Sequence, residues 1–382
     1  MTLEEFRRDI YACIHCGECK VGPRSQMPIC PSGERTGYNT TYACGFIDLA
    51  RSLLEGKAEW SDSGIRNAIY SCMACGACLE RCNPQVGIRT SDVFRELKAE
   101  FVRREQGPPI ASAQVLESLA KVGNFFGQPR HEILQWADGL QVSEVRPGNE
   151  VVFFVGCYEA FDPQTSFIAR AVTNLLNKAK VNWGVLGKAE VCCGYPALEL
   201  GDEKLFRRLV RENIEKIHTI GPRIVVVACA CCYGIMVKDW PQVLPLKFEV
   251  LHISQFALDL VREGRLKIRG KLDERVTLHD PCHLGRRGGR VYDAPRDLLQ
   301  AIPGVKLEEM PRNRDESWCC GAGGCMNIHS SDYAQATAGE RLREAARTEA
   351  ETLVVPSCPI CHSNFRSSVA AGGAEGGTEG PL

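Results

Sequence analysis

Residues 224–232 read Ile-Val-Val-Val-Ala-Cys-Ala-Cys-Cys, a short run of β-branched residues that stops at a group of cysteines. Three other short apolar runs stop in the same way, at Cys157, Cys282 and Cys358. Such runs are typical of strands buried in a parallel sheet, and ligands bind at the carboxyl ends of these strands. Because packing alone does not end four strands in cysteine, we expect a ligand site at that edge.

The cysteines of residues 151–368 form an internal repeat. Each copy contains a lone cysteine, a Cys-Cys-Gly tripeptide and a Cys-x2-Cys pair, and equivalent cysteines lie 125, 127 and 129 residues apart. Offsets this constant indicate the duplication of one unit. Amphipathic helical stretches fall between the expected strands, at 163–180, 202–219 and 331–347. We predict two α/β units with parallel sheets, over residues 151–270 and 271–368.

A different cysteine pattern occupies residues 1–100. Two Cys-x2-Cys-x2-Cys triplets occur there, and each is followed by one further cysteine, Cys30 or Cys82. Triplets at this spacing hold a cubane [4Fe-4S] cluster, and the distant fourth cysteine holds the other cluster. The rule assigns Cys13, Cys16, Cys19 and Cys82 to the first cluster, and Cys72, Cys75, Cys78 and Cys30 to the second. Two zinc sites are the alternative, but zinc does not need the third cysteine of a triplet.

The spacing departs from that of a compact bacterial ferredoxin. Ten residues separate Cys19 from Cys30, where three are usual, and 41 residues separate the two motifs. Apolar residues between Phe46 and Leu54 follow the period of a helix. The pattern resembles the helical two-cluster ferredoxin domains of respiratory iron–sulfur subunits, which predicts a helical domain over residues 1–100. Cys44 lies outside both motifs and is interpreted as a small buried residue.

Two segments contain no cysteine. Residues 101–150 include several Gly-Pro turns and are predicted to form a linker with short helices. Residues 369–382 are rich in glycine and are predicted to be disordered.

Five cysteines in each repeat are more than one zinc ion or one cubane cluster requires. Adjacent cysteines do not easily reach one tetrahedral ion, but they can reach two different irons. The glycines that follow them, Gly194 and Gly321, let the backbone come close to a bulky cluster.

These residues resemble the CCG domains of heterodisulfide reductase, and their order behind a ferredoxin domain resembles the D-type subunits of that family over residues 5–365. The resemblance implies a pseudo-twofold pair of Rossmann-like units with one or two noncubane [4Fe-4S] clusters, between which a disulfide is cleaved. Carried over, site A is Cys157, Cys192, Cys193, Cys229 and Cys232, and site B is Cys282, Cys319, Cys320, Cys358 and Cys361. The alternative is zinc, or no metal, in one set. Cys231 lies between Cys229 and Cys232, so the choice of ligand cysteines at that turn stays open. Cys325 is expected to pack in the core or to line the site.

Basic residues follow Cys282, namely His283, Arg286, Arg287 and Arg290. They would stabilise an anionic disulfide or cluster thiolates, and a solvated loop is the alternative. His283 and His362 each follow a ligand cysteine, so each is a candidate proton donor to a leaving thiolate or a hydrogen-bonding partner of the ligand. Of the two, we select His283 as the candidate catalytic residue.

Composition excludes several classes of protein. The 382 residues are 44% apolar with a net charge of −1, which argues against a general nucleic-acid binder. The first residues lack the apolar core of a secretion signal, so the 21 cysteines are expected to be reduced in the cytoplasm, and 18 of them to be ligands. No apolar run is long enough to span a membrane. No flavin or NAD fingerprint occurs, so a partner protein is expected to exchange the electrons.

The function predicted is that of an iron–sulfur oxidoreductase subunit of anaerobic metabolism, acting on a small-molecule or protein disulfide. By resemblance, its partner is a membrane cytochrome b or a flavoprotein, and a membrane partner would hold it at the inner face. The alternative is the electron-accepting subunit of a glycolate, lactate or glycerol-3-phosphate dehydrogenase, in which the chemistry takes place on a flavin subunit.

Overall fold

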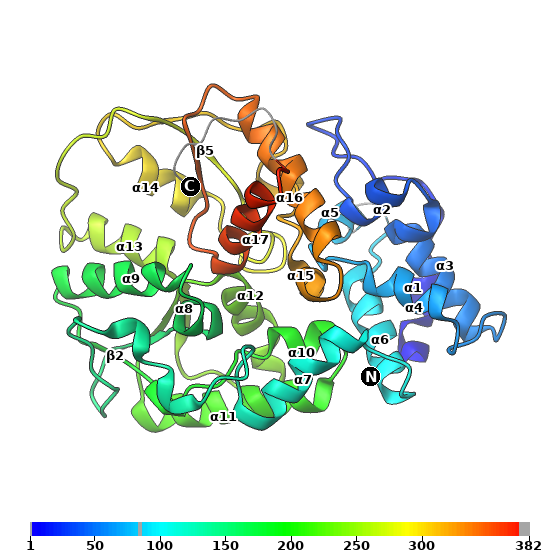
Figure 1. Ribbon diagram of the computed structural model, residues 1–382, viewed down its shortest axis with the longest axis horizontal. Helices are drawn as coiled ribbons and strands as arrows, with labels where there is room; N and C mark the ends of the chain where they lie inside the picture. The colour runs from blue at the N-terminus through cyan, green and yellow to red at the C-terminus, as the bar shows by residue number, and fades with distance from the viewer. Residues whose placement is uncertain (1, 83–85, 374–382) are drawn as a thin grey trace.

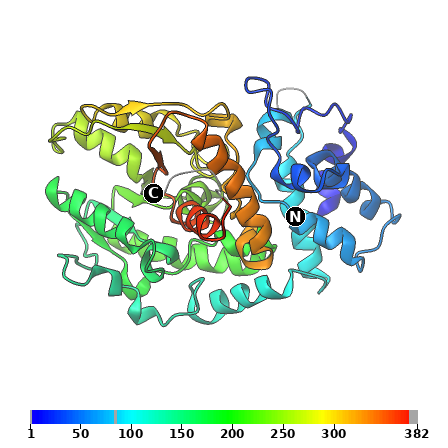
Figure 2. The ribbon, with the colours of Figure 1, turned by 45° about the horizontal axis from the view of Figure 1, so that its top comes forward.

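A helical N-terminal part lies beside an α/β part in the computed structural model, which describes residues 2–82 and 86–373 (Figures 1 and 2). Asn83, Pro84 and most of the predicted disordered tail, residues 374–382, lie outside the described residues. Across the described ranges, no helix combines the length and the apolar character that crossing a membrane requires.

The N-terminal part is entirely helical where it is described, apart from one isolated β-bridge. Phe46 of α3 packs edge-to-face on Phe94 of α6, with 5.2 Å between the ring centroids, and both rings are buried. The helices are α1 (Arg7–Tyr11), α2 (Pro31–Thr36), α3 (Ala43–Leu54), α4 (Ser63–Tyr70), α5 (Ala77–Cys82), α6 (Thr90–Arg103) and, in the connector, α7 (Ile110–Val122). The prediction of a helical ferredoxin-like domain is confirmed.

The first α/β unit contains a four-stranded parallel sheet in the order β2-β1-β3-β4. Along β1, Val152 and Phe154 face a core that includes residues of α11 and α12, whereas Val151 and Phe153 face α9 and α13. Both faces are therefore covered, which explains the uninterrupted apolar runs. The strands are β1 (Val151–Phe154), β2 (Trp183–Val185), β3 (Ile224–Val227) and β4 (Glu249–His252). The helices are α8 (Cys157–Phe161), α9 (Ser166–Lys178), α10 (Tyr195–Leu200), α11 (Glu203–Ile220), α12 (Ala230–Lys238) and α13 (Ile253–Arg262).

The second unit repeats this topology on a smaller scale. Its parallel sheet has the order β6-β5-β7, which matches β2-β1-β3 strand by strand. The elements are β5 (Arg275–Leu278), α14 (Asp293–Gln300), β6 (Lys306–Leu307), α15 (Met326–His329), α16 (Ser331–Ala346), β7 (Thr352–Val354) and α17 (Pro359–Ala370). Short 3-10 helices fall at Leu3–Phe6, Asn39–Thr41, Arg130–Glu132, Gln135–Ala137, Gly187–Ala189, Trp240–Gln242, Arg314–Glu316 and Gly323–Cys325.

Helix α11 illustrates how local sequence sets an element. The carboxylate of Asp202 accepts a hydrogen bond from the backbone N–H of Leu205, which caps the first turn. Buried residues then recur every three or four positions from Leu205 to Ile217, so one stripe packs on the sheet. The helix ends at Gly221, whose φ of +70° closes the last turn.

The N-terminal part packs closely against both α/β units. A Cβ on Gly323 would lie 2.1 Å from the carbonyl oxygen of Met73, so only glycine allows this approach. Arg95 of α6 donates to Glu199 at 2.7 Å and to Asp239 at 2.9 Å. These contacts place the cysteines of residues 1–100 against those of residues 151–368.

His329 joins three segments and makes the packing sensitive to acid. Its Nε2 donates to the carbonyl oxygen of Tyr70 at 3.1 Å, and its Nδ1 accepts from the hydroxyl of Ser112 at 2.9 Å. Burial lowers the pKa of His329 to about 4 from its usual 6.5. The unfolded chain therefore takes up this proton first, so the stabilisation is complete above pH 6.5 and is lost as the pH falls towards 4.

We expect the wild type to lose about 1–2 kcal/mol more unfolding free energy than His329→Gln between pH 7 and pH 5. Glutamine keeps hydrogen-bonding capacity but does not titrate, so the other acidic effects cancel in the comparison. Urea unfolding under anaerobic conditions, followed by far-UV circular dichroism at both pH values, measures the difference. Equal losses in the two proteins would contradict this role for His329.

Candidate metal centres

Four cysteines follow the carboxyl ends of the strands, as the sequence predicts. Cys157, Cys229, Cys282 and Cys358 come directly after, or within four residues of, β1, β3, β5 and β7. At β1, Gly156 has a φ of +80° and turns the chain so that Cys157 begins α8. Both sheets therefore present thiols at the edge where parallel strands commonly bind ligands.

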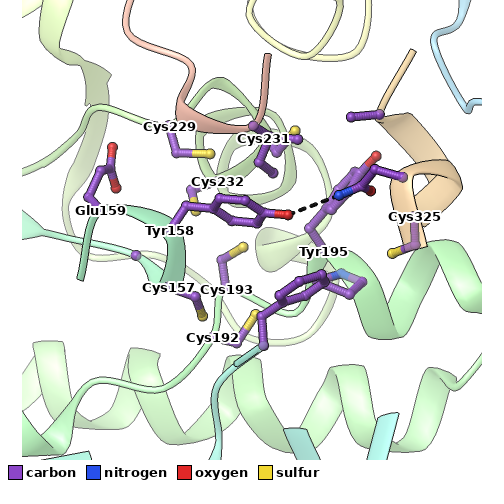
Figure 3. Close-up of a pocket in the computed structure, with 16 residues that line it drawn as sticks. Cys157, Tyr158, Glu159, Cys192, Cys193, Tyr195, Cys229, Cys231, Cys232 and Cys325 are labelled. Atoms are coloured by element: carbon purple, nitrogen blue, oxygen red, sulfur yellow. Dashed lines mark hydrogen bonds between the residues drawn. The ribbon is translucent and has the colours of Figure 1, made fainter. Parts of the chain in front are cut away.

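The predicted site A cysteines all line one cavity of about 510 Å³ (Figure 3). The Cys192 thiol is hydrogen-bonded to those of Cys157 and Cys193, and the Cys193 thiol also to that of Cys232. Cys232 in turn contacts Cys229, so the five thiols form a continuous row. The structure thus brings all five together.

The predicted site B cysteines also form a continuous row. The Cys319 thiol lies between those of Cys282 and Cys320, and Cys320 contacts Cys361, which contacts Cys358. All five are buried.

His279 joins this set, although no sequence motif singles it out. A ring nitrogen of His279 and the sulfurs of Cys320 and Cys361 lie within 4.8 Å of one another. Its position three residues before Cys282, directly after β5, was the available signal.

The two rows of thiols meet at one residue. The Cys358 thiol, from the second unit, is hydrogen-bonded to the thiols of Cys229 and Cys231 of the first unit. Both of these cysteines line the site A cavity, so the structure leaves open which of them binds a metal. The junction places sites A and B in direct contact in the buried interior.

The N-terminal cysteines gather at two further cavities. Cys30, Cys72, Cys75 and Cys78 line one of about 560 Å³. Cys13, Cys16, Cys19 and Cys82 line another of about 410 Å³. These are the two cross-ligated sets that the motif rule assigns. Among the described residues, Cys16 is the one exposed cysteine.

One contact connects the N-terminal part to site B. The Cys75 thiol is hydrogen-bonded to that of Cys319, which lowers the pKa of Cys75 to about 6. Arg286 adds to this, because it is buried and donates at 3.0 Å to the Cys75 carbonyl oxygen. The cavity lined by Cys75 therefore adjoins site B, and the cavity lined by Cys13 is the outer one.

Cys44 is buried, as expected, but it also lines the outer cavity. The Cys19 thiol donates to it and lowers the pKa of Cys44 to about 6. The outer cavity therefore contains a fifth thiol that the motif rule does not assign.

Hydrogen bonds between neighbouring thiols favour a thiolate at one position of the site A row and at three positions of the site B row. The pKa values of Cys193, Cys320 and Cys358 are held well below their usual range by thiols that donate to them. The pKa of Cys282 is lowered in the same way by Cys319, with help from His283. Thiolate is the form that binds iron or zinc.

The solvated-loop alternative is wrong for three of the four basic residues after Cys282, since His283 is buried as well. Arg286 is 5% exposed, and it donates to backbone carbonyls in both parts of the protein. The side chain of Arg287 is also buried, at the cavity lined by Cys75, where it faces Glu199. Only Arg290 is largely solvent-exposed, in a salt bridge with Glu80.

Both candidate histidines are buried beside a ligand cysteine. The Nδ1 of His283 lies 3.3 Å from the Cys282 sulfur, and its ring meets that of Tyr195 edge-on. His362 contacts the ring of Phe167, with 5.2 Å between the centroids, and its Nδ1 has no hydrogen-bonding partner.

Two buried acids near site A are not apparent from the sequence. Glu190 accepts hydrogen bonds from the backbone N–H groups of Val155 and Gly156, and burial raises its pKa to about 8. Glu159 has no hydrogen-bonding partner, and burial raises its pKa far above the usual value. No local pattern in the sequence marks either of them.

The donor sets fit iron–sulfur clusters. The N-terminal cavities present four and five thiols, and most other side chains that wall the site A cavity are aromatic or apolar, such as Tyr158, Tyr195 and Ile360. A thiolate set in an apolar shell is the usual setting of such clusters.

Comparisons with known proteins agree with this chemistry. A family model described as a cysteine-rich domain, CCG, matches residues 151–237 and 276–366, and one described as a 4Fe-4S dicluster domain matches residues 9–86. The chain is 30% identical to the D subunit of the dihydromethanophenazine:CoB–CoM heterodisulfide reductase of Methanosarcina barkeri, covering 94% of this chain and 88% of that protein. The corresponding protein of Methanosarcina mazei is 31% identical, with the same coverage. The EtfAB:quinone oxidoreductase of Syntrophomonas wolfei is 30% identical over 81% of this chain and 45% of that protein.

Proposed function

We propose, on the premise that this chain belongs to the family of heterodisulfide reductase D subunits, that its two CCG units interconvert a disulfide and two thiols. The chain is an iron–sulfur electron-transfer subunit of an oxidoreductase. What we propose in addition is the substrate, a disulfide, and the place where it reacts, the junction of the two CCG units. It rests mainly on one observation, the contact of Cys358 with Cys229 and Cys231.

Four sets of side chains would hold the clusters. The cubane sets are Cys13, Cys16, Cys19 and Cys82, and Cys72, Cys75, Cys78 and Cys30. The noncubane sets are Cys157, Cys192, Cys193, Cys229 and Cys232, and Cys282, Cys319, Cys320, Cys358 and Cys361. When bound, such clusters supply one-electron transfer and irons that can hold a thiolate sulfur.

A disulfide is chemically suited to the junction because its two sulfurs separate on reduction. The S–S bond takes up two electrons from the redox partner and two protons from water, and two thiols leave. Two thiol sets in contact offer one binding position to each sulfur. His283 is placed to hold a hydrogen bond at the Cys282 sulfur, 3.3 Å from its Nδ1.

The arrangement of the thiol sets supports an approach of the redox partner at the outer cavity and electron transfer between that cavity and site B. Cys16 is exposed, so a partner can approach the outer set closely, whereas Cys75 of the second set contacts Cys319 of site B. Relatives are subunits of larger oxidoreductases, which implies a redox partner. We propose that this partner is a membrane cytochrome b or a flavoprotein.

A second candidate is an electron-transfer subunit without its own substrate. The similarity to a protein named EtfAB:quinone oxidoreductase, which is 30% identical over 81% of this chain, favours it. It corresponds to the dehydrogenase alternative derived from the sequence. The two candidates differ in whether the chain alone reduces a disulfide.

The test is metal analysis and turnover on the anaerobically purified chain. We expect about sixteen irons and no zinc per chain, at four irons per cluster in four sets. Reduced methyl viologen should then drive the reduction of a small neutral disulfide, measured by loss of viologen absorbance. A full iron complement without disulfide turnover would contradict the proposal and favour the second candidate. Zinc in one repeat would contradict a two-cluster active site.

A further inference from the structure

The two N-terminal cavities differ in the charges that surround their thiols. The cavity lined by Cys75, which we call the inner cavity, also has three cations and one acid in its wall, namely Arg95, Lys98, Arg287 and Glu199. No lysine or arginine is among the described residues that line the outer cavity. Net charge near an iron–sulfur cluster helps to set its reduction potential, so the two thiol sets are not equivalent as electron carriers.

Lys98 brings a buried positive charge to the inner cavity. It lies on α6, which packs against α10 of the first α/β unit (Figure 1). The residue is 1% exposed, and its Nζ donates to the carbonyl oxygen of Cys72 at 3.4 Å and lies 5.5 Å from the centre of the Tyr70 ring. The part of the chain that the structure describes offers this ammonium no salt bridge. Because buried charges are screened far less than exposed ones, the charge of Lys98 acts on the thiols nearby.

Arg287 brings a second buried charge to the same cavity, from the second α/β unit. Its side chain is 8% exposed, and its Nη2 lies 3.7 Å from the Glu199 carboxylate. A Cβ on Gly76 would lie 2.7 Å from the Cδ of Arg287, so the glycine between Cys75 and Cys78 makes room for this side chain. The buried Nε has no hydrogen-bonding partner among the described residues. Such an N–H is costly unless a ligand supplies an acceptor, and the sulfurs of a cluster are acceptors.

Nearby acids do not cancel all of this positive charge. Glu199 and Asp239 both accept hydrogen bonds from Arg95, at 2.7 and 2.9 Å. Among the described side chains, these two carboxylates therefore face three cations at the inner cavity. Arg286 adds another cation on the side of site B, where it is buried and donates to the carbonyl oxygen of Cys75. The inner thiols are thus surrounded by an excess of positive charge.

The outer cavity has no such excess. The one acid among the described residues that line it, Glu18, is 43% exposed and forms a salt bridge with Arg81 at 2.8 Å. Lys20 does not line the cavity, and its exposed ammonium donates to Asn39 at 2.6 Å. Cys44 contributes a fifth thiol, which adds negative charge when it ionises. Exposed charges are also screened by salt and water, so they affect the outer thiols less.

From this asymmetry we infer that Lys98 and Arg287 make the inner thiol set the one that takes up the first electron supplied by the redox partner. The inference rests on the clusters of the proposed function, and not on its disulfide. A thiolate-bound cluster becomes more negative on reduction, so a buried cation stabilises the reduced state more than the oxidised state and raises the potential. Burial alone acts in the opposite direction, because it disfavours added charge.

The position of the inner set gives this order a use. Its Cys75 thiol contacts Cys319 of site B, so an electron held there waits at the place where it is consumed. Reducing a disulfide takes two electrons, and an electron stored at the inner set leaves the outer set free to accept the second one from the partner.

The test is a redox titration of the anaerobically purified, iron-replete chain, followed by electron paramagnetic resonance. Cys16→Ser alters an exposed ligand of the outer set and so identifies the signal of that set. In the wild type, the signal of the inner set should appear at the higher potential. We expect the inner set to be preferred about ten-fold or more, which corresponds to about 59 mV for one electron.

Variants of opposite sign separate an effect of charge from a structural disturbance. Lys98→Met removes a cation and should lower the equilibrium constant for reduction of the inner set about ten-fold, and Arg287→Gln should act in the same direction from the other unit. Glu199→Gln removes an acid and should raise that constant. The signal of the outer set should not move in any of the three. Lys57→Met is the matched control, because Lys57 is 72% exposed and lines neither cavity, and it should shift neither potential.

The outcomes separate the inference from the proposed function. If the outer set is reduced first, or if Lys98→Met and Glu199→Gln shift the inner potential in the same direction or not at all, the inference is wrong and the proposed function stands. If the potentials have the expected order and respond to charge in a chain that reduces no disulfide, the inference holds and the proposed function fails.

Discussion

Replacing Cys320 by serine is expected to lower the rate of viologen-driven disulfide reduction by about 100-fold or more. Mutating a residue that only orients a metal ligand already lowers metal affinity or activity by about 10–100-fold, and Cys320 is a predicted ligand itself. Cys320 lies at the centre of site B. Its sulfur contacts those of Cys319 and Cys361 and lies within 4.8 Å of a ring nitrogen of His279. Serine keeps the size of the side chain but is a poor ligand for iron.

The readouts are the iron content, the electron paramagnetic resonance spectrum and the rate. The variant should lose the iron of site B and retain that of the N-terminal sets, whose cysteines lie in separate cavities. Cys325→Ser is the matched control, since Cys325 is also buried and lines the site A cavity, but none of the thiol hydrogen bonds described above involves it. It should keep a near-normal rate. A Cys320→Ser protein with full activity would contradict the assignment of site B.

Replacing Glu344 by glutamine is expected to cost about 3–5 kcal/mol of unfolding free energy, because it leaves the buried Arg341 guanidinium without its counter-charge and Arg312 with only the partly exposed Glu340. The Glu344 carboxylate accepts from the Nη1 of Arg341 at 2.7 Å and from the Nε of Arg312 at 3.0 Å. All three side chains are at most 1% exposed. Burial raises the pKa of Glu344, but Arg341 and Arg312 outweigh it, so the net pKa is below the usual value.

The measurement is anaerobic urea unfolding followed by far-UV circular dichroism. Glutamine has nearly the size of glutamate, so the change isolates the charge. The control is Glu349→Gln, which removes the partner of Arg275 at a position where the carboxylate is 79% exposed. Exposed pairs contribute at most about 1 kcal/mol. A loss for Glu344→Gln no larger than that of the control would show that the buried network is not needed for stability.

The same network explains how the second unit holds site B with only a three-stranded sheet. Arg341 also donates to the Nδ1 of His279 at 3.3 Å, and Arg312 donates to the carbonyl oxygen of Pro28 in the N-terminal part. The charged core therefore links α16 to the metal site on one side and to the ferredoxin-like domain on the other.

Local patterns in the sequence predicted the elements well. The runs at 151–155, 224–228, 276–278 and 353–355 form β1, β3, β5 and β7, and the three predicted helical stretches form α9, α11 and α16. Hydrophobic period and the position of turn residues act over a few neighbours, so they can be read without the fold. The strands β2, β4 and β6 were missed, since none of them leads into a cysteine.

The sequence alone determined which cysteines could belong to one set, because motif spacing and the repeat offset are properties of the chain. Only the tertiary structure decided which sets touch. The contacts of Cys358 with Cys229 and Cys231, and of Cys75 with Cys319, join residues more than 120 positions apart. Such contacts depend on how two sheets and a helical domain pack, and close approaches like that of Gly323 to Met73 set that packing. Side chains such as Glu159, Glu190 and Arg286 acquire their character from burial, which no local pattern encodes.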